Sequence, residues 1–441
     1  MENPKEKQAT EQPKTDDLAK VEKWWLDRRV KWAVVGLILV VIVLVLTLVA
    51  NNSSSPNQSN QEQLTATVPV NEALAAGKLL TNNQCEGEGV PYKLSVSPMK
   101  PEDFSIIVPY GLMIGGHVTP IDHQYFSPAS YLSQPDAYGV YAMADSTIVD
   151  IGSRPRPFGE EYRIVFTVSC TFLYYYDLVT SLSPEIQQAY DDVNNDSGGK
   201  KPINIAVKAG QLIGRIGGQT LDFAVWDTTK PLDGFVVPEH YEAEPWKIFT
   251  ADPLDYYDDE LKKFILTRYV RTETPVSGKI NYDIDGRLIG NWFLEGTNGY
   301  SGNRSAEDGS YWTSHLSFAP DHYVPDRFII SIGDYEVSPD AGPGSQFITA
   351  TNKPNPKDIS VETGLVKYDL SSWSYLDGSG AMWDRNSIAS GITIRSESQQ
   401  NPQTCVLVQM LETRKLKFET FKGQSCTDVT EFSKSAKNYT R

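Results

Sequence analysis

One unbroken apolar run, residues 32–50, constrains this chain more than any other feature. It contains no charged residue, and a helix of that length rises about 28 Å, enough to cross the hydrocarbon core of a bilayer. Five lysines and arginines lie within residues 20–31, whereas residues 51–76 contain none. Because positive charge stays on the inner side, residues 1–31 are predicted to be a disordered cytoplasmic leader, and the chain after residue 50 is predicted to lie outside the cell membrane.

A cleaved signal peptide is the rival interpretation of this run. The run and its polar leader are both too long for one, and Leu48-Val49-Ala50 is a poor cleavage site. We therefore expect an uncleaved, single-pass transmembrane helix over residues 32–50. Residues 51–66 are rich in Asn, Ser and Gln and are predicted to form a flexible stalk.

The net charge restricts which partners the protein can bind, and the cysteine content indicates whether disulfides form. The formal net charge of −16 argues against nucleic acid as a partner, since nucleic-acid binding depends on clustered Lys and Arg. The four cysteines all fall on the predicted outer side, where an even number favours disulfides. Cys405 and Cys426 flank a predicted hairpin, so we expect them to pair, which leaves Cys85 and Cys170 for each other.

Short alternating strands separated by Gly, Pro, Asn and Asp clusters predict a mainly β protein. Residues 67–255 carry a first series of strands, with one helical stretch over residues 184–193. Residues 256–275 are predicted to be a helical connector, because acidic residues precede lysines in its first turns. Residues 276–441 carry a second series of strands that is typical of a β-sandwich or a small β-barrel.

Two short segments concentrate the residues able to do chemistry. Residues 115–126 begin with a Gly-Gly turn, end with an aromatic pair, and contain three potential metal ligands, His117, Asp122 and His123. Residues 210–227 are patterned as a β-hairpin in which Asp222 alternates with apolar residues. If the two segments meet, His117, Asp122 and Asp222 would form a three-ligand metal site with an open position.

Residues 109–227 resemble the lysostaphin/LytM-type zinc endopeptidases, whose β-sheet groove cleaves peptidoglycan cross-bridges. His117 and Asp122 match the family's Gly-x-His-x-x-x-Asp segment, with one extra residue between them. Residues 207–214 (VKAGQLIG) match its hairpin closely, residues 175–178 fall where Tyr-x-His-Leu is expected, and residues 220–223 fall where His-x-His-Phe is expected. The resemblance implies a LytM-like β domain with zinc as its cofactor.

The residues that carry out the family's chemistry differ in this chain. Asp222 stands in place of the third zinc-binding histidine, and Asp177 and Thr220 stand in place of the two helper histidines. Two carboxylates weaken a bound metal as a Lewis acid, and the lost histidines remove the group that orients or deprotonates water. Asp177 or His123 would have to supply the missing base in an active enzyme.

Purely structural roles compete with these assignments. His117 and Asp122 also fit a hydrogen-bonded turn, and Asp222 also fits a buried carboxylate that pairs with His117 without a metal. His123 also fits a position at the surface or at the start of the next strand. Asp177 also fits a surface residue that follows an aromatic strand.

We therefore expect a membrane-anchored, extracytoplasmic protein whose degenerate LytM-like domain binds a cell-envelope peptide, glycan or protein. The alternative is an active metalloendopeptidase that acts on envelope peptides through His117, Asp122 and Asp222. A third interpretation is a structural component of an envelope assembly.

Overall fold

The computed structural model describes residues 69–87, 93–156, 159–194, 202–302, 311–335, 345–349, 351, 353–399 and 402–441. All of them belong to one compact unit that begins at Leu64. The predicted leader, transmembrane helix and stalk, residues 1–66, lie outside the described residues. Within the described ranges, no helix combines the length and the apolar character needed to cross a membrane.

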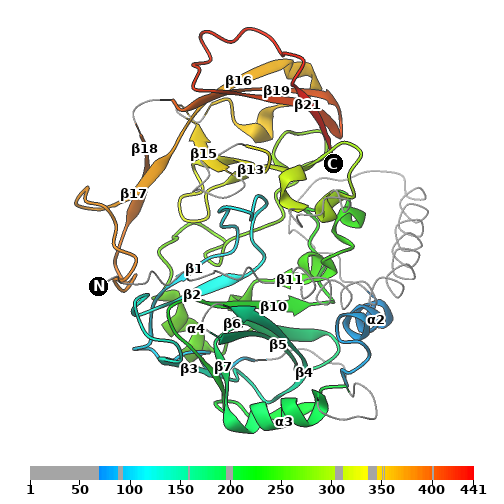
Figure 1. The fold of residues 1–441 in the computed structure, drawn as a ribbon, viewed down its shortest axis with the longest axis vertical. Helices are drawn as coiled ribbons and strands as arrows, with labels where there is room; N and C mark the ends of the chain where they lie inside the picture. The colour runs from blue at the N-terminus through cyan, green and yellow to red at the C-terminus, as the bar shows by residue number, and fades with distance from the viewer. Residues whose placement is uncertain are drawn as a thin grey trace, which may run out of the picture. The chain divides into compact units, whose positions relative to one another are not determined.

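An antiparallel eight-stranded sheet dominates the part of the chain before residue 252 (Figure 1). The strand order is β1-β2-β10-β6-β5-β4-β8, and the short β11 pairs with β10. The strand bounds are β1 Phe104–Val108, β2 Gln124–Pro128, β4 Ser146–Arg156, β5 Gly159–Thr167, β6 Phe172–Val179, β8 Ile205–Val207, β10 Leu221–Asp227 and β11 Thr250–Ala251. A smaller sheet has the order β3-β9-β7, with bounds β3 Tyr138–Tyr141, β7 Ser181–Leu182 and β9 Leu212–Ile216.

The described helices are short. The α-helices are α2 Val70–Leu80, α3 Pro184–Asn194 and α4 Asp259–Leu266. Helix α3 agrees with the helix expected over residues 184–193, and α4 begins where the Asp258 side chain accepts a hydrogen bond from the Leu261 amide. The 3-10 helices are η1 Pro238–Tyr241, η2 Pro245–Phe249, η3 Pro253–Asp255, η4 Gly299–Ser301, η5 Tyr311–Ser314, η6 Pro356–Asp358 and η7 Val361–Thr363.

Both faces of the large sheet are covered. On β6, Tyr174 and Tyr176 pack into one apolar cluster with Phe223 of β10. The alternate residue Tyr175 packs into a second cluster on the opposite face, which also contains Phe293 and Tyr300 from later in the chain. The predicted alternation is confirmed for β10, because Leu221, Phe223 and Val225 pack in one cluster on one face. The opposite face, which was expected to be polar and exposed, is buried as well.

The last part of the chain forms a closed antiparallel barrel, which decides between the predicted sandwich and the predicted barrel. Its strand order is β12-β13-β14-β15-β16-β19-β20-β21. The strand bounds are β12 Gly290–Leu294, β13 His315–Pro320, β14 Phe328–Ile332, β15 Ser345–Thr349, β16 Leu365–Ser371, β19 Thr404–Glu412, β20 Lys415–Lys422 and β21 Lys437–Thr440. A separate hairpin contains β17 Trp373–Asp377 and β18 Ile394–Ser398.

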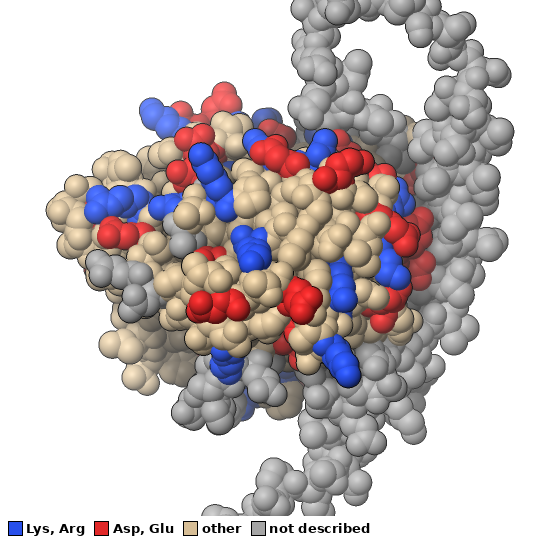
Figure 2. Space-filling model, turned by 90° about the horizontal axis from the view of Figure 1, so that it is seen from above, with Lys and Arg blue, Asp and Glu red and all other residues tan. Residues whose placement is uncertain are grey.

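On the face of the molecule that is seen from above, basic and acidic side chains are interspersed (Figure 2).

The loop before β2 contacts Gln346 of the barrel strand β15 and Trp312 of η5. The Gly115 amide donates a 3.0 Å hydrogen bond to the Gln346 side chain, which returns a 3.1 Å hydrogen bond to the Gly115 carbonyl. A Cβ atom at Gly116 would lie 3.1 Å from the Trp312 ring, so glycine allows the close approach. This loop carries His117, whose position therefore depends on a hydrogen-bond partner of the loop, Gln346, that is 231 positions from Gly115.

Both expected disulfides are present. Cys85 pairs with Cys170 across 85 residues, and Cys405 pairs with Cys426 across 21 residues. We expect Cys85→Ser/Cys170→Ser to lower the free energy of unfolding by about 4–5 kcal/mol and Cys405→Ser/Cys426→Ser by about 3 kcal/mol, because a longer closed loop restricts the unfolded chain more. Urea denaturation of the two double variants tests this order, and a larger loss for the second variant would contradict it.

Because His315 and His322 are buried, we expect the free energy of unfolding to fall in acid. Burial lowers the pKa of His315 and of His322 to about 3, from 6.5. A histidine with a lowered pKa stabilises the fold fully above pH 6.5, and this stability is lost as the pH falls toward 3. Burial raises the pKa of Asp321 to about 6, which opposes the loss between pH 6 and 3.8.

Substituting His322 isolates this effect, because within the described residues neither of its ring nitrogens makes a hydrogen bond. We expect His322→Phe to flatten the dependence of unfolding free energy on pH between 6.5 and 3. Chemical denaturation at a series of pH values measures the slope. Equal slopes for the variant and the unsubstituted protein would show that His322 does not titrate in this way.

Candidate functional site

The strand register brings the two predicted segments together. Strand β10 pairs with β2 on one side and with β6 on the other. Asp222 lies directly opposite Tyr125 of β2 and directly opposite Asp177 of β6. Since paired residues of an antiparallel sheet point to the same face, these three side chains share one face of the sheet.

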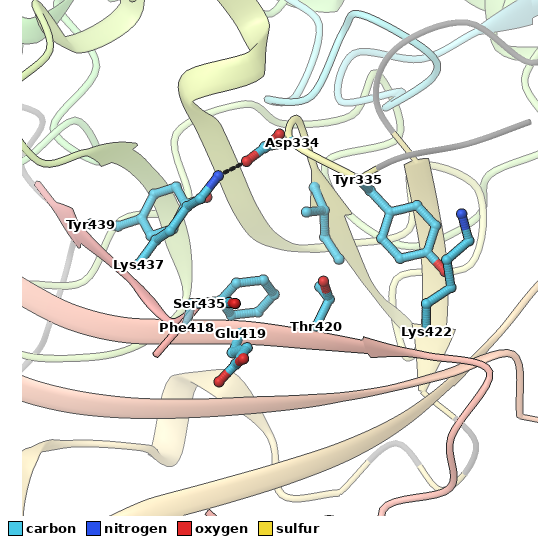
Figure 3. A pocket seen from close by; sticks show the side chains of 10 residues that line it. Asp334, Tyr335, Phe418, Glu419, Thr420, Lys422, Ser435, Lys437 and Tyr439 are labelled. Atoms are coloured by element: carbon cyan, nitrogen blue, oxygen red, sulfur yellow. Dashed lines mark hydrogen bonds and ion pairs between the residues drawn. The ribbon is translucent and has the colours of Figure 1, made fainter. Parts of the chain in front are cut away.

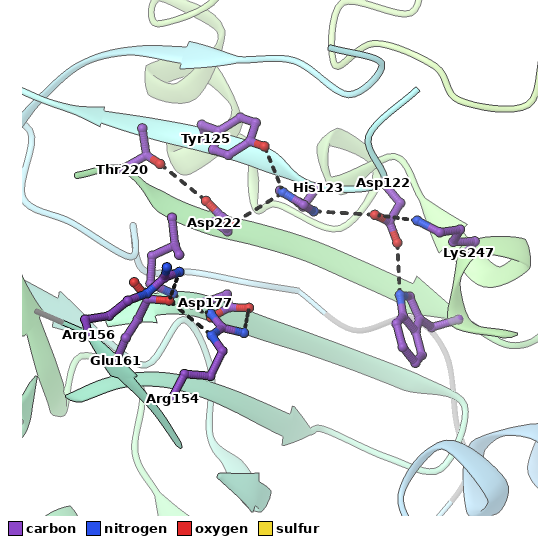
Figure 4. A network of polar contacts seen from close by, with 12 residues as sticks. Asp122, His123, Tyr125, Arg154, Arg156, Glu161, Asp177, Thr220, Asp222 and Lys247 are labelled. Carbon is purple, nitrogen blue, oxygen red and sulfur yellow. Dashed lines mark hydrogen bonds and ion pairs between the residues drawn. The ribbon is translucent and has the colours of Figure 1, made fainter. Parts of the chain in front are cut away.

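His123, the residue just before β2, lies between two carboxylates (Figure 4). Its Nδ1 lies 3.4 Å from the Asp122 carboxylate, and its Nε2 lies 3.2 Å from the Asp222 carboxylate. The Tyr125 hydroxyl lies 3.0 Å from the same Nε2. Thr220, at a predicted helper position, donates a 3.3 Å hydrogen bond to Asp222. The histidine that contacts both carboxylates is therefore His123.

Asp122 has two further partners from η2. The Lys247 ammonium lies 3.0 Å from Oδ1 of Asp122, and the Trp246 indole donates a 2.9 Å hydrogen bond to Oδ2. Lys247 also lies 3.0 Å from Glu244. Both oxygens of Asp122 are thus occupied by donors or cations of the protein itself.

Asp177 belongs to a separate group of charges on the same sheet. The Arg154 guanidinium spans Asp177 and Glu161, with a 3.1 Å hydrogen bond from Nη1 to Asp177 and a 3.1 Å hydrogen bond from Nε to Glu161. Arg156 donates a further 2.8 Å hydrogen bond to Glu161. This pairing ties Asp177, the predicted replacement base, to a permanent cation.

Charge pairing outweighs burial for Asp122 and Lys247. Burial by itself would raise the pKa of Asp122, but Lys247 and His123 hold that pKa well below its usual range. Burial by itself would lower the pKa of Lys247, but Asp122 and Glu244 raise it. Both groups are therefore charged at neutral pH, as a buried ion pair requires.

The pKa values of Asp222, His123 and His117, which surround this ion pair, shift in different directions. Burial raises the pKa of Asp222 to about 7, and the charge of Asp177 adds to the effect. Burial opposes the charged form of His123, but Asp222 and Asp122 raise its pKa overall. Desolvation by the surrounding protein lowers the pKa of His117 to about 4, with His123 and Lys247 adding to it, although the side chain keeps an exposed surface. His117 is therefore neutral at pH 7.

Residues from the second half of the chain cover the site. Lys247 lies 4.7 Å from the centre of the Tyr300 ring, and Tyr300 packs against Tyr311 just before the barrel strand β13. The side chains of Lys247, Asp122 and Asp222 are only 6%, 7% and 9% exposed. The polar network is thus enclosed by the protein.

The residues present do not fit a zinc ion in this arrangement. Zinc requires free lone pairs of its ligands at about 2.0–2.2 Å, whereas Asp122 already contacts an ammonium group and both ring nitrogens of His123 face carboxylates. The Lys247 cation would also repel a divalent ion. Among the described residues, no three His, Cys, Asp or Glu side chains are arranged to hold a metal.

Sequence reasoning identified part of this site. It placed His117, Asp122 and Asp222 in one site, and it favoured a position at the surface or at the start of the next strand for His123. The His117 ring centre lies 6.1 Å from that of His123, so it borders the network. Lys247, Trp246 and Arg154 were missed. Trp246 is 124 residues from Asp122, and no local pattern in the sequence joins two such distant positions.

Removing the buried ammonium should destabilise the protein. We expect Lys247→Met to lower the free energy of unfolding by about 3–5 kcal/mol, because it leaves a buried carboxylate without its cation. Adding Asp122→Asn should restore part of the loss, since that carboxylate is then neutral. Urea denaturation measures both variants.

Lys208→Met is a matched control, because Lys208 pairs with Asp145 at 2.8 Å while the two side chains are 80% and 63% exposed. It should leave the free energy of unfolding nearly unchanged, because both charges of this pair lie in water. Equal losses for Lys208→Met and Lys247→Met would contradict the importance of the buried pair.

No family model and no curated protein matches this chain. Among solved structures, Helicobacter pylori Csd3 overlaps it in a hexagonal crystal form with 17% identity and a TM-score of 0.21, over 32% of each chain. The orthorhombic form overlaps with 19% identity and a TM-score of 0.21, over 32% of this chain and 33% of the other. A zinc-containing peptidase from Vibrio cholerae overlaps with 16% identity and a TM-score of 0.22, over 32% of this chain and 39% of the other. The overlap thus spans about a third of each of these proteins, and such low TM-scores do not establish a shared overall fold.

Proposed function

We propose that this protein is a non-catalytic, membrane-anchored, extracytoplasmic protein that binds a cell-envelope peptide, glycan or protein. The observation that carries the non-catalytic part of this proposal is that the Lys247 ammonium lies 3.0 Å from Asp122. It lies at one of the carboxylates that the LytM resemblance assigns to zinc. The buried charge that a metal would balance is therefore balanced by a side chain of the protein.

The pairing of the two bases that the sequence suggested, Asp177 and His123, supports the same conclusion. Hydrolysis requires a group that can take a proton from water next to the scissile bond. Asp177 is paired with Arg154, and His123 faces Asp122 and Asp222 with its two nitrogens. Both candidate bases are thus engaged by other charged groups of the protein.

The binding role rests on the predicted location and on the architecture. The apolar run over residues 32–50 would anchor the chain, and the stalk would hold the folded part away from the membrane. A sheet whose polar network is enclosed provides a rigid scaffold. The barrel adds a second surface to which an envelope component could bind.

An active zinc endopeptidase-like hydrolase remains the alternative, and one observation favours it. The pKa of His117 is lowered to about 4 by desolvation, His123 and Lys247. A neutral, partly exposed imidazole is competent to bind a metal. In this alternative His117, Asp122 and Asp222 would hold zinc after Lys247 had moved away from Asp122.

Metal analysis and an envelope assay separate the two functions. The full-length chain, purified in detergent and incubated with zinc, should retain substoichiometric zinc after dialysis and should release no peptides from purified peptidoglycan. It should nevertheless co-sediment with cell-envelope material. Stoichiometric zinc together with peptide release, both lost in His117→Ala, would overturn the proposal in favour of the hydrolase.

A further inference from the structure

The barrel contains a pocket of about 340 Å³, lined by residues of β14, β20 and β21 and by residues near them (Figure 3). The charged groups of its lining are engaged by the protein. Lys437 pairs with Asp334, Glu419 accepts hydrogen bonds from Ser433, and Lys422 has partners as well. The lining of this pocket therefore does not indicate the chemistry of a ligand.

Arg163 of β5 is a cation on the large sheet that is held by aromatic rings. Its guanidinium carbon lies 4.7 Å from the centre of the Tyr175 ring, 4.8 Å from that of Trp246 and 5.9 Å from that of Trp226. Aromatic rings attract a cation through their electron-rich faces, and the planar guanidinium stacks on them. The three contacts therefore hold the guanidinium group in place.

The charge of Arg163 has no counter-charge among the residues that the structure describes. Within them, no hydrogen bond or ion pair joins Arg163 to another residue, and its Nε is buried without an acceptor. The side chain as a whole is partly exposed. Because a buried N–H group without an acceptor costs free energy, most such groups in proteins have a partner. The unpaired donors of Arg163 therefore favour a ligand that supplies acceptor oxygens.

The acidic residues on the neighbouring strand positions have partners of their own. Glu161 and Asp177 share the Arg154 guanidinium, and Asp150 of β4 is also engaged. An anion that approaches Arg163 would therefore meet carboxylates whose charges are already paired.

The strand beside Arg163 leaves room for a ligand. Gly152 of β4 pairs with Arg163 of β5, and paired residues of an antiparallel sheet point to the same face. A Cβ atom at Gly152 would meet no heavy atom within 4 Å apart from its own chain neighbours. The space next to Arg163 is therefore open where any other residue would place a side chain.

We propose that Arg163 binds the carboxylate of a peptide. A guanidinium group presents its N–H donors in one plane, as a fork that matches the two oxygens of a carboxylate. The aromatic rings already hold this fork in position, which lowers the entropy cost of binding. The rest of the peptide would lie over Gly152, where the space is open.

This inference rests on the proposed binding role and names the chemical group that is recognised. Peptides supply carboxylates at their C-terminus and on acidic side chains, and both offer the same chemistry to Arg163. The guanidinium lies against Trp246, whose indole donates to Asp122. The site thus borders the polar network but does not use its charges.

Calorimetric titration of the full-length chain, purified in detergent, tests the inference with two probes. Acetyl-trialanine carries only a terminal carboxylate and acetyl-glutamate amide only a side-chain carboxylate, so the tighter of the two identifies the source. Acetyl-trialanine amide and acetyl-glutamine amide are their uncharged counterparts. We expect at least one carboxylate to bind, and its uncharged counterpart to bind at least about tenfold more weakly, because it lacks the charge-assisted hydrogen bonds.

Substitutions of Arg163 locate the site. Arg163→Met should weaken carboxylate binding at least about tenfold. Arg163→Lys should restore only part of the loss, since an ammonium group keeps the charge but lacks the planar fork. Arg395→Met is the matched control and should leave binding unchanged, because it removes one positive charge from an exposed ion pair with Glu397 on the β17–β18 hairpin.

Gly152→Ile tests the open space without removing the charge. Isoleucine favours strands, so the thermal unfolding temperature should not fall, whereas its side chain should block the ligand and abolish carboxylate binding. This variant keeps the test decisive if Arg163→Met fails to fold.

Four results would overturn the inference. They are absence of binding by both carboxylates, equal binding of the uncharged probes, equal effects of Arg163→Met and Arg395→Met, and unchanged binding by Gly152→Ile.

The two proposals fail in different ways. Stoichiometric zinc with peptide release would overturn the non-catalytic function, while carboxylate binding at Arg163 would still be decided by the titrations. If neither carboxylate binds and the chain still co-sediments with envelope material without retaining zinc, the inference fails and the proposed function stands.

Discussion

The buried ion pair between Asp122 and Lys247 is the interaction on which the candidate site depends. A carboxylate enclosed by protein must be paired or protonated, since the loss of water otherwise costs several kcal/mol. Here the cation comes from η2, next to the Trp246 indole that donates to the same carboxylate. The pairing fixes η2 against the loop before β2, and Tyr300 then closes over the ammonium.

This arrangement changes what the surrounding residues are able to do. His123 lies between two carboxylates, and Arg154 neutralises Asp177 and Glu161. Each acidic residue that replaces a histidine of the resembling family has a polar or basic partner nearby. These acidic residues of the sheet therefore contact other side chains of the protein, which holds them in place.

Several features were predictable because they depend on neighbours in the sequence. The Cys405–Cys426 disulfide spans 21 residues and flanks the β19–β20 hairpin, so the local turn pattern sufficed to find it. The apolar phase of β10 was also correct, because Phe223 and Val225 do pack in one cluster. The burial of its other face was not predictable, since that face is covered by residues such as Phe293 and Tyr300 from beyond residue 290.

The sequence by itself determined the β-rich character, the pairing of Cys405 with Cys426, and the two short segments that carry Asp122, His123 and Asp222. Alternating apolar residues and turn residues act over a few positions, and their pattern is therefore visible in the chain. Only the tertiary structure decided that His123 rather than His117 joins the two carboxylates, that Lys247 balances Asp122, and that β14 and β20 enclose a pocket. The physical reason is that side-chain pairing and barrel closure join positions more than eighty residues apart, through register and packing that no local pattern encodes.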